Sequence, residues 1–147
     1  MGLFQSFNIS ATGMTAERFR TDIISENIAN INTTKTENGD PYRRKIVTFA
    51  EKNVTPFSTY YSTSRNRAVG NGVKVNRVTE DYSTDFVMEY DPSHPDADEN
   101  GYVSYPNVNT VTEMTNLIDA TRAYEANVTA FNASKSMAQA GLTIGKS

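Results

Sequence analysis

The chain has 147 residues, with 14 lysines and arginines against 17 aspartates and glutamates, a formal charge of −3 and no cysteine. This length fits one or two domains, and the balanced charge, with no basic stripe, argues against nucleic-acid binding. Without cysteine the chain has neither disulfides nor a thiolate site, and no stretch approaches the roughly 18 apolar residues of a membrane-spanning helix.

The N-terminal segment predicts an amphipathic helix over about residues 8–31. Its apolar residues recur near one slowly drifting helical face, which indicates a surface for packing against another helix. The residues of this helix that we assign to an assembly interface are Phe7, Met14, Ile24, Ile28 and Ile31. Ser10 or Thr12 is a suitable N-terminal cap, and Asn30 suits the end of the helix because its amide bonds the backbone locally.

A different kind of sequence follows this helix. An Asn-Gly and an Asp-Pro step after residue 35 mark a turn and end the helical periodicity. Residues 52–72 have no sustained period and predict a long loop. β-Branched and aromatic residues predict strands, which we expect to form one small sheet, at about 42–49, 73–78 and 86–90.

Two small basic clusters lie in this central region. One comprises Arg43, Arg44 and Lys45, and the other comprises Arg65 and Arg67. Because neither is interleaved with aromatic residues in the manner of a nucleic-acid-binding stripe, we interpret them as solvated strand or loop residues. We therefore expect no nucleic-acid partner.

His94, the single histidine, lies in a loop rich in aspartate and proline. With Asp96 and Asp98 it could form a metal or hydrolytic site, because imidazole and clustered carboxylates bind divalent ions. The spacing of Asp96, Asp98 and Asn100 also matches half of an EF-hand loop, but Asn107 stands where the last ligand should be glutamate. We favour a turn built on Asx and proline residues, with no catalytic residue, metal or cofactor.

The most regular pattern is at the C-terminus, where residues 107–145 predict one long amphipathic helix. Its seam steps by four and three residues over four heptads, which is typical of a coiled coil with a left-handed supercoil. The seam runs through Met114, Leu117, Thr121, Tyr124, Val128, Phe131, Lys135, Ala138 and Leu142. Ile118 lies off the seam and needs a second contact. The predicted interface of this helix comprises Met114, Leu117, Ile118, Tyr124, Val128, Phe131 and Leu142.

The predicted fold is mainly α with a β insert. Residues 1–34 and 106–147 form a core domain whose two terminal helices pair as a coiled-coil assembly domain. Residues 35–105 form a small β-rich outer domain. The residues that we expect to tie the helix ends to backbone groups are Asn27, Asn30, Asn107 and Asn109.

Several stretches of the sequence resemble one known family. Residues 25–33, which read Ser-Glu-Asn-Ile-Ala-Asn-Ile-Asn-Thr, resemble the element that ends the first helix of bacterial flagellar rod and hook proteins. Residues 106–118 and 120–132 resemble the C-terminal signature of the same family, and residues 91–105 resemble its proximal-rod members. The resemblance covers essentially the whole chain.

This resemblance implies a structural subunit of the flagellar basal-body rod, which crosses the periplasm and cell wall and transmits torque. It implies no enzymatic activity. The implied partners are other rod subunits, further copies of the chain and, in transit, the flagellar export apparatus. It also implies export without a cleaved signal peptide, in agreement with the lack of a basic n-region before Arg18.

Three other interpretations of the residues carry less weight. Met1-Gly2 begins a pattern for N-myristoylation, but the apolar residues that follow read more simply as the leader of a helix, so we expect no membrane anchor. The heptad seam would also suit a coiled-coil adaptor unrelated to flagella. The loop around His94 would suit a metal-dependent hydrolase.

Overall fold

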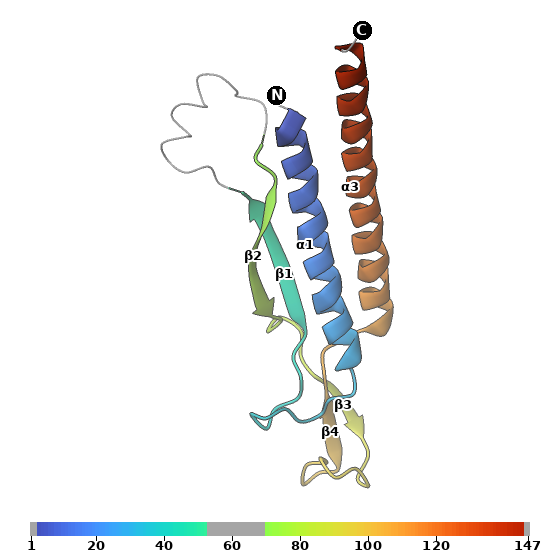
Figure 1. The fold of residues 1–147 in the computed structure, drawn as a ribbon. Coiled ribbons are helices and arrows are strands. Elements are labelled where there is room, and N and C mark those ends of the chain that lie inside the picture. Colours follow the sequence, from blue (N-terminus) through green and yellow to red (C-terminus); the bar gives the residue numbers. More distant parts are fainter. Residues whose placement is uncertain (1–2, 53–69, 146–147) are drawn as a thin grey trace, which may run out of the picture. The chain divides into compact units, whose positions relative to one another are not determined.

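The computed structural model describes residues 3–52 and 70–145 of the chain. Within these residues, two long helices stand near the ends of the sequence and four short strands lie between them (Figure 1). In chain order the elements are α1 (Leu3–Ala29), β1 (Lys45–Glu51), β2 (Val73–Glu80), β3 (Val87–Tyr90), β4 (Tyr102–Tyr105) and α3 (Thr110–Ile144). The predicted order of helix, β-rich insert and helix is therefore confirmed.

Helix α1 begins earlier than the sequence predicted. It starts at Leu3, so Ser10 and Thr12 lie inside the helix and the prediction that one of them caps its start is wrong. Thr12 instead donates its hydroxyl hydrogen to the carbonyl of Ile9 at 2.7 Å, as side chains of this type do inside helices. The helix ends at Ala29, about two residues before the predicted end, and the amide of Asn30 donates to the carbonyl of Glu26 at 2.9 Å.

The strands form two separate two-stranded sheets, so the prediction of one sheet is wrong. Strand β1 pairs with β2, and β3 pairs antiparallel with β4 with Tyr90 opposite Tyr102. Strand β1 starts three residues later than predicted, because the backbone N–H of Arg44 donates to the side chain of Asn107 rather than to a strand. Strand β4 was not predicted, and most of the predicted loop at 52–72 lies outside the described residues.

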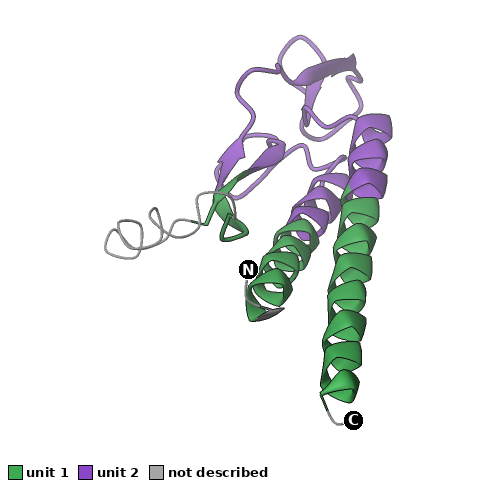
Figure 2. Cartoon of the chain, turned by 90° about the horizontal axis from the view of Figure 1, so that it is seen from above, with its two compact units in different colours: residues 1–19, 49–76, 120–147 green, residues 20–48, 77–119 purple. Residues whose placement is uncertain are grey.

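The chain divides into two compact units (Figure 2). The first contains residues 1–19, 49–76 and 120–147, and the second contains residues 20–48 and 77–119. Each unit therefore includes part of α1, part of α3 and part of the β1–β2 hairpin. The division into a helical core domain and a β-rich outer domain remains a prediction.

The first unit is held by contacts between small and aromatic residues. The rings of Phe7 on α1 and Phe131 on α3 lie 5.0 Å apart in a tilted arrangement. Gly13 faces Asn127 so closely that an added Cβ would come within 2.6 Å of the Asn127 Oδ1 atom. At Gly72, a positive φ of 90° and contact with Thr12 also leave no room for a side chain.

We predict that Gly13→Ala destabilises the protein even though alanine is the better helix former. The new methyl group would overlap Asn127 and force a shift, which typically costs about 1–3 kcal/mol. Gly141→Ala is the matched control, because its Cβ would meet nothing within 4 Å and the substitution should stabilise the helix by up to about 1 kcal/mol. Urea denaturation followed by circular dichroism would measure both, and equal effects would contradict the close contact.

Candidate assembly interface

The buried positions of α3 differ from the predicted seam by one residue. Glu113 and Ala120, seven residues apart, and Ser134, fourteen residues further on, are buried, whereas Met114 and Lys135, each one residue after a buried residue, are exposed. The residues of α3 that are fully buried in the single chain are therefore small or polar rather than large and apolar. Lys135, which lies on the predicted seam, is exposed to solvent in the single chain.

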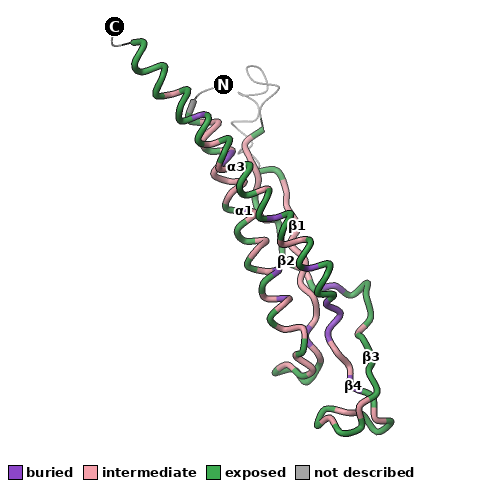
Figure 3. Tube along the Cα trace, turned by 90° about the vertical axis from the view of Figure 1, so that its right-hand side faces the viewer, coloured by how far each residue is buried: buried purple, intermediate pink, exposed green. Residues whose placement is uncertain are grey.

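An apolar surface remains open on the first turns of α3. Val111, Met114 and Ile118 have relative exposures of 74%, 55% and 53%. Their spacing of three and four residues places them on one face of the helix, away from the buried Glu113 and Ala120. Figure 3 shows α3 exposed along most of its length, with only isolated buried residues.

The residues of the predicted interface fall into three groups in the single chain. One residue, Ile24, is buried. Seven are half-buried: Phe7, Met14, Ile28, Ile31, Leu117, Val128 and Phe131. Four are exposed: Met114, Ile118, Tyr124 and Leu142. The structure brings Phe7 and Phe131 into contact, and the role of the whole set in assembly remains a prediction.

The centre of the second unit is polar. Six hydrogen-bonded side chains, which we call the polar cluster, lie there: Asn27, Tyr42, Arg44, Asp81, Asn107 and Glu113. Glu113 is only 1% exposed. Its Oε1 atom accepts hydrogen bonds from Arg44 Nε at 2.9 Å and Nη2 at 2.7 Å, and its Oε2 atom accepts one from Asn27 Nδ2 at 3.1 Å. The buried charge is thus paired with a cation and hydrogen-bonded at both oxygens, as burial requires.

Asn27 uses the full hydrogen-bonding capacity of its amide. Besides Glu113, its Nδ2 atom donates to the carbonyl of Lys45 at 2.9 Å. Its Oδ1 atom accepts from the N–H of Lys45 and from the hydroxyl of Tyr42, each at 2.9 Å. Burial raises the pKa of the Tyr42 phenol, and the nearby carboxylates raise it further, so the hydroxyl remains a donor. One side chain therefore joins the end of α1 to β1 and α3.

Asn107 plays a similar part at the start of α3. Its Oδ1 atom accepts from the N–H of Arg44 at 2.8 Å, and its Nδ2 atom donates to the carbonyls of Asp81 and Thr84 at 2.9 and 3.0 Å. Asn109 caps the helix, since its Oδ1 atom accepts from the N–H of Thr112 at 3.1 Å. The asparagines chosen from the sequence thus have backbone partners.

Sequence reasoning missed the charged members of the polar cluster. Arg44 was interpreted as solvated, but its side chain is 23% exposed and pairs with Glu113 and, at 3.6 Å, with Asp81. That prediction is wrong for Arg44, because the partners lie 37 and 69 residues away in the chain and no local pattern reveals them. The only local signal was Glu113, a glutamate directly before Met114, the first residue of the seam. Arg65 and Arg67 lie outside the described residues.

The loop around His94 is a turn that uses its own polar atoms. The Oδ1 atom of Asp98 accepts from the N–H groups of Asn100 and Tyr102, both at 2.8 Å, and His94 Nδ1 accepts from the N–H of Asp96 at 3.1 Å. Asp96 also accepts from the hydroxyl of Thr34. Among the described residues, no three histidine, cysteine or acidic side chains gather in a way that would hold a metal ion.

Comparison with known proteins identifies the class. The family model described as "Flagella basal body rod protein" matches residues 7–35, and the model described as "Flagellar basal body rod FlgEFG protein C-terminal" matches residues 99–144. The matched segments contain α1 and α3 almost completely. These two matches place the chain among the structural proteins of the flagellar rod.

The full-length relatives identify the family. The chain is 45% identical to the flagellar basal-body rod protein FlgC of Borreliella burgdorferi, over 98% of both chains. It is 47% identical to FlgC of Bacillus subtilis and 38% identical to FlgC of Escherichia coli, each over 99% of this chain and 100% of the relative. The chain therefore belongs to the FlgC family of flagellar basal-body rod proteins. Within the part of the chain that the structure describes, no helix is long and apolar enough to span a membrane.

We predict that Arg44→Met destabilises the protein by about 3–5 kcal/mol, because it leaves the buried carboxylate of Glu113 without its cation. Replacing both partners, in Arg44→Met with Glu113→Leu, should cost less than the single substitution. Lys45→Met is the control, since its pair with Glu26 is about one-third exposed and worth about 0–1 kcal/mol. Urea denaturation would measure all three, and equal losses in the two single variants would contradict the argument.

We predict that Asp81 makes the free energy of unfolding vary with pH in the acidic range. Hydrogen bonds from Ser83 lower the pKa of Asp81, so its ionised form is favoured in the folded state. That contribution is complete above the unfolded pKa of about 3.9 and is lost as the pH falls through the lower folded value. Asp81→Asn should therefore reduce the loss of stability below about pH 4, and Ser83→Ala should act in the same direction. Thermal unfolding from pH 2 to 7 would test this, and an unchanged acid slope would contradict it.

Proposed function

We propose that this rod subunit assembles through its two terminal helices, whose outer faces pack against neighbouring subunits in the tubular shaft that transmits torque to the hook. As a member of the FlgC family the protein is a structural subunit of the flagellar basal-body rod. The single observation that carries the proposal is the apolar face that α3 leaves exposed in the isolated chain. A helix of a water-soluble chain normally turns such residues inward.

The exposed apolar side chains of α3 extend along its whole length. They are Val111, Met114, Ile118, Tyr124, Met137, Leu142 and Ile144. Complete burial of a side chain of this kind contributes about 1.5–3 kcal/mol relative to full exposure. Contacts with neighbours could therefore supply much of the free energy that orders a 35-residue helix.

The one-residue offset between the buried positions and the heptad seam fits this proposal. The small or polar side chains of Glu113, Ala120 and Ser134 are buried within the chain. The neighbouring position that begins at Met114 remains available to a partner helix, and the seam spacing suits a coiled coil. We propose that α3 is thus shared between its own chain and an adjacent subunit.

Export and torque transmission follow from the same arrangement. We propose that the chain passes through the flagellar export apparatus without a cleaved signal peptide, and that its helices reach full order only when they pack on neighbours. Once packed, they resist twisting because close-packed interiors deform little and the contacts repeat around the axis. The comparisons with known proteins do not favour a non-flagellar adaptor or a metal-dependent hydrolase.

Deletion of the gene in its native host tests the function directly. Quantitative mass spectrometry of purified basal bodies should find the chain in stoichiometric amounts. Electron microscopy of the deletion strain should show loss of the rod and hook. Intact flagella in that strain, with the chain absent from normal basal bodies, would overturn the proposal.

We predict that Ile118→Asp abolishes incorporation into basal bodies while leaving the unfolding free energy of the purified chain nearly unchanged. The side chain is 53% exposed before assembly, so a carboxylate is tolerated there until a neighbour covers it. Thr115→Asp is the control, because it adds the same charge one turn away at an exposed polar residue. Mass spectrometry of basal bodies gives the readout, and normal incorporation of Ile118→Asp would exclude this face from the interface.

A further inference from the structure

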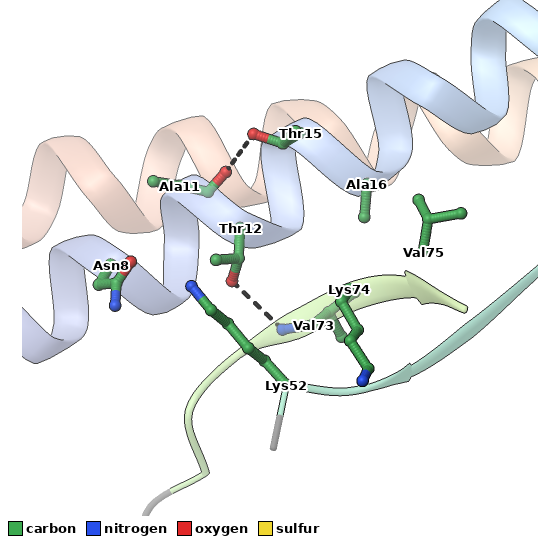
Figure 4. A pocket seen from close by; sticks show the side chains of 9 residues that line it. All are labelled: Asn8, Ala11, Thr12, Thr15, Ala16, Lys52, Val73, Lys74 and Val75. Atoms are coloured by element: carbon green, nitrogen blue, oxygen red, sulfur yellow. Dashed lines mark hydrogen bonds between the residues drawn. The ribbon is translucent and has the colours of Figure 1, made fainter. Parts of the chain in front are cut away.

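A groove in the first unit lies between α1 and the β1–β2 hairpin (Figure 4). Its volume is about 440 Å3, within the range of pockets that bury small ligands or side chains. The residues that line it are Asn8, Ala11, Thr12, Thr15, Ala16, Lys52, Val73, Lys74 and Val75. Thr12 already accepts a hydrogen bond from the N–H of Val73 at 3.2 Å, so it fixes the wall of the groove.

The chemistry of the groove selects its occupant. Small residues of α1 form one side, and Val73 and Val75 supply apolar surface on the other. Lys52 extends from the hairpin toward α1, whereas the side chain of Lys74, between the two valines on β2, points away from α1. None of the nine described lining residues is acidic. The groove therefore suits an apolar or aromatic side chain that is accompanied by carboxylates.

The β3–β4 hairpin of the second unit has the complementary properties. Met88, Tyr90 and Tyr102 have relative exposures of 56%, 64% and 43%, and the strand register places all three on one face. The rings of Tyr90 and Tyr102 lie 5.3 Å apart, edge to face. A two-stranded hairpin is marginal in water, so an aromatic face left open to solvent needs an explanation.

The loop that joins β3 to β4 is acidic. Residues 91–101 contain four carboxylates and no lysine or arginine. The carboxylates belong to Asp91, Asp96, Asp98 and Glu99. Hydrogen bonds from Ser93 lower the pKa of Asp91, so they favour its ionised form. The tip of the hairpin thus combines exposed aromatic rings with negative charge.

We propose that the groove of one copy binds the β3–β4 hairpin of a second copy, with Tyr90 in the groove and the acidic loop beside Lys52. The proposal rests on the proposed function, because a contact between copies presupposes assembly. The two surfaces belong to different parts of the chain, so the contact is heterologous and repeats from copy to copy. Such contacts generate rings or helical arrays, according to the rotation between neighbours.

The absence of native cysteine permits a cross-linking test with one cysteine in each chain. The native host would express two differently tagged versions, Val75→Cys and Tyr90→Cys, and disulfide-linked dimers carrying both tags would be quantified in purified basal bodies. Val78→Cys is the control for Val75→Cys, since it lies on the opposite face of β2. Val87→Cys is the corresponding control for Tyr90→Cys. We expect mixed dimers at least about tenfold above either control, because disulfides form only within a few ångströms.

Charge reversal provides a second test. Lys52→Glu in the groove-bearing chain should lower the yield of mixed dimers several-fold by repelling the acidic loop. Glu99→Lys in the hairpin-bearing chain should restore part of that yield. Loss without any recovery would show that charge complementarity does not operate between these two surfaces.

The outcomes separate this contact from the proposed function. If basal bodies contain the chain but mixed dimers stay at control levels, the groove contact is refuted and the rod function stands. If Tyr90→Cys instead cross-links to a different rod protein, the occupant is not a second copy and the proposal is also refuted. If the chain is missing from basal bodies, the proposed function itself fails.

Discussion

The buried carboxylate of Glu113 is the constraint on which the second unit depends. An ionised group that is 1% exposed must find a cation and hydrogen-bond donors, and here Arg44 and Asn27 supply them. Since Glu113 lies in α3, Arg44 directly before β1 and Asn27 near the end of α1, all three parts of the chain must reach one geometry before the charge is satisfied. A buried ion pair adds little net stability, but breaking one is costly, so it penalises alternative arrangements.

The same constraint explains the amide side chains around it. Asn27 bonds the backbone of Lys45, the first residue of β1, and Asn107 bonds the backbone of Arg44 just before it. Both amides make the maximum or nearly the maximum number of hydrogen bonds. An amide can donate and accept at one point, which no apolar residue can do. The second unit thus uses hydrogen bonds to join segments that are too short to bury a large apolar core.

Polar packing inside the chain also leaves apolar surface for assembly. Helix α3 turns Glu113, Ala120 and Ser134 inward, and residues such as Val111 and Ile118 remain in solvent. In an ordinary amphipathic helix the apolar face covers the core, whereas α3 also keeps several large apolar side chains in solvent. This arrangement suits a subunit whose helices complete their packing on neighbours, and it accounts for the long apolar pattern at the end of a chain with little internal core.

The sequence alone determined the long terminal helices, the β-rich insert, the turn at Asn100 and the family, because periodicity, turn chemistry and sequence signatures are local in the chain. It also selected Asn27 and Asn107. Only the tertiary structure decided that the strands form two sheets and that Arg44 is paired with Glu113. It also decided that the buried residues of α3 lie one residue before the predicted seam positions. Those features depend on contacts between residues far apart in sequence. The effect of a side chain's charge or size at one position then depends on a partner that no local pattern identifies.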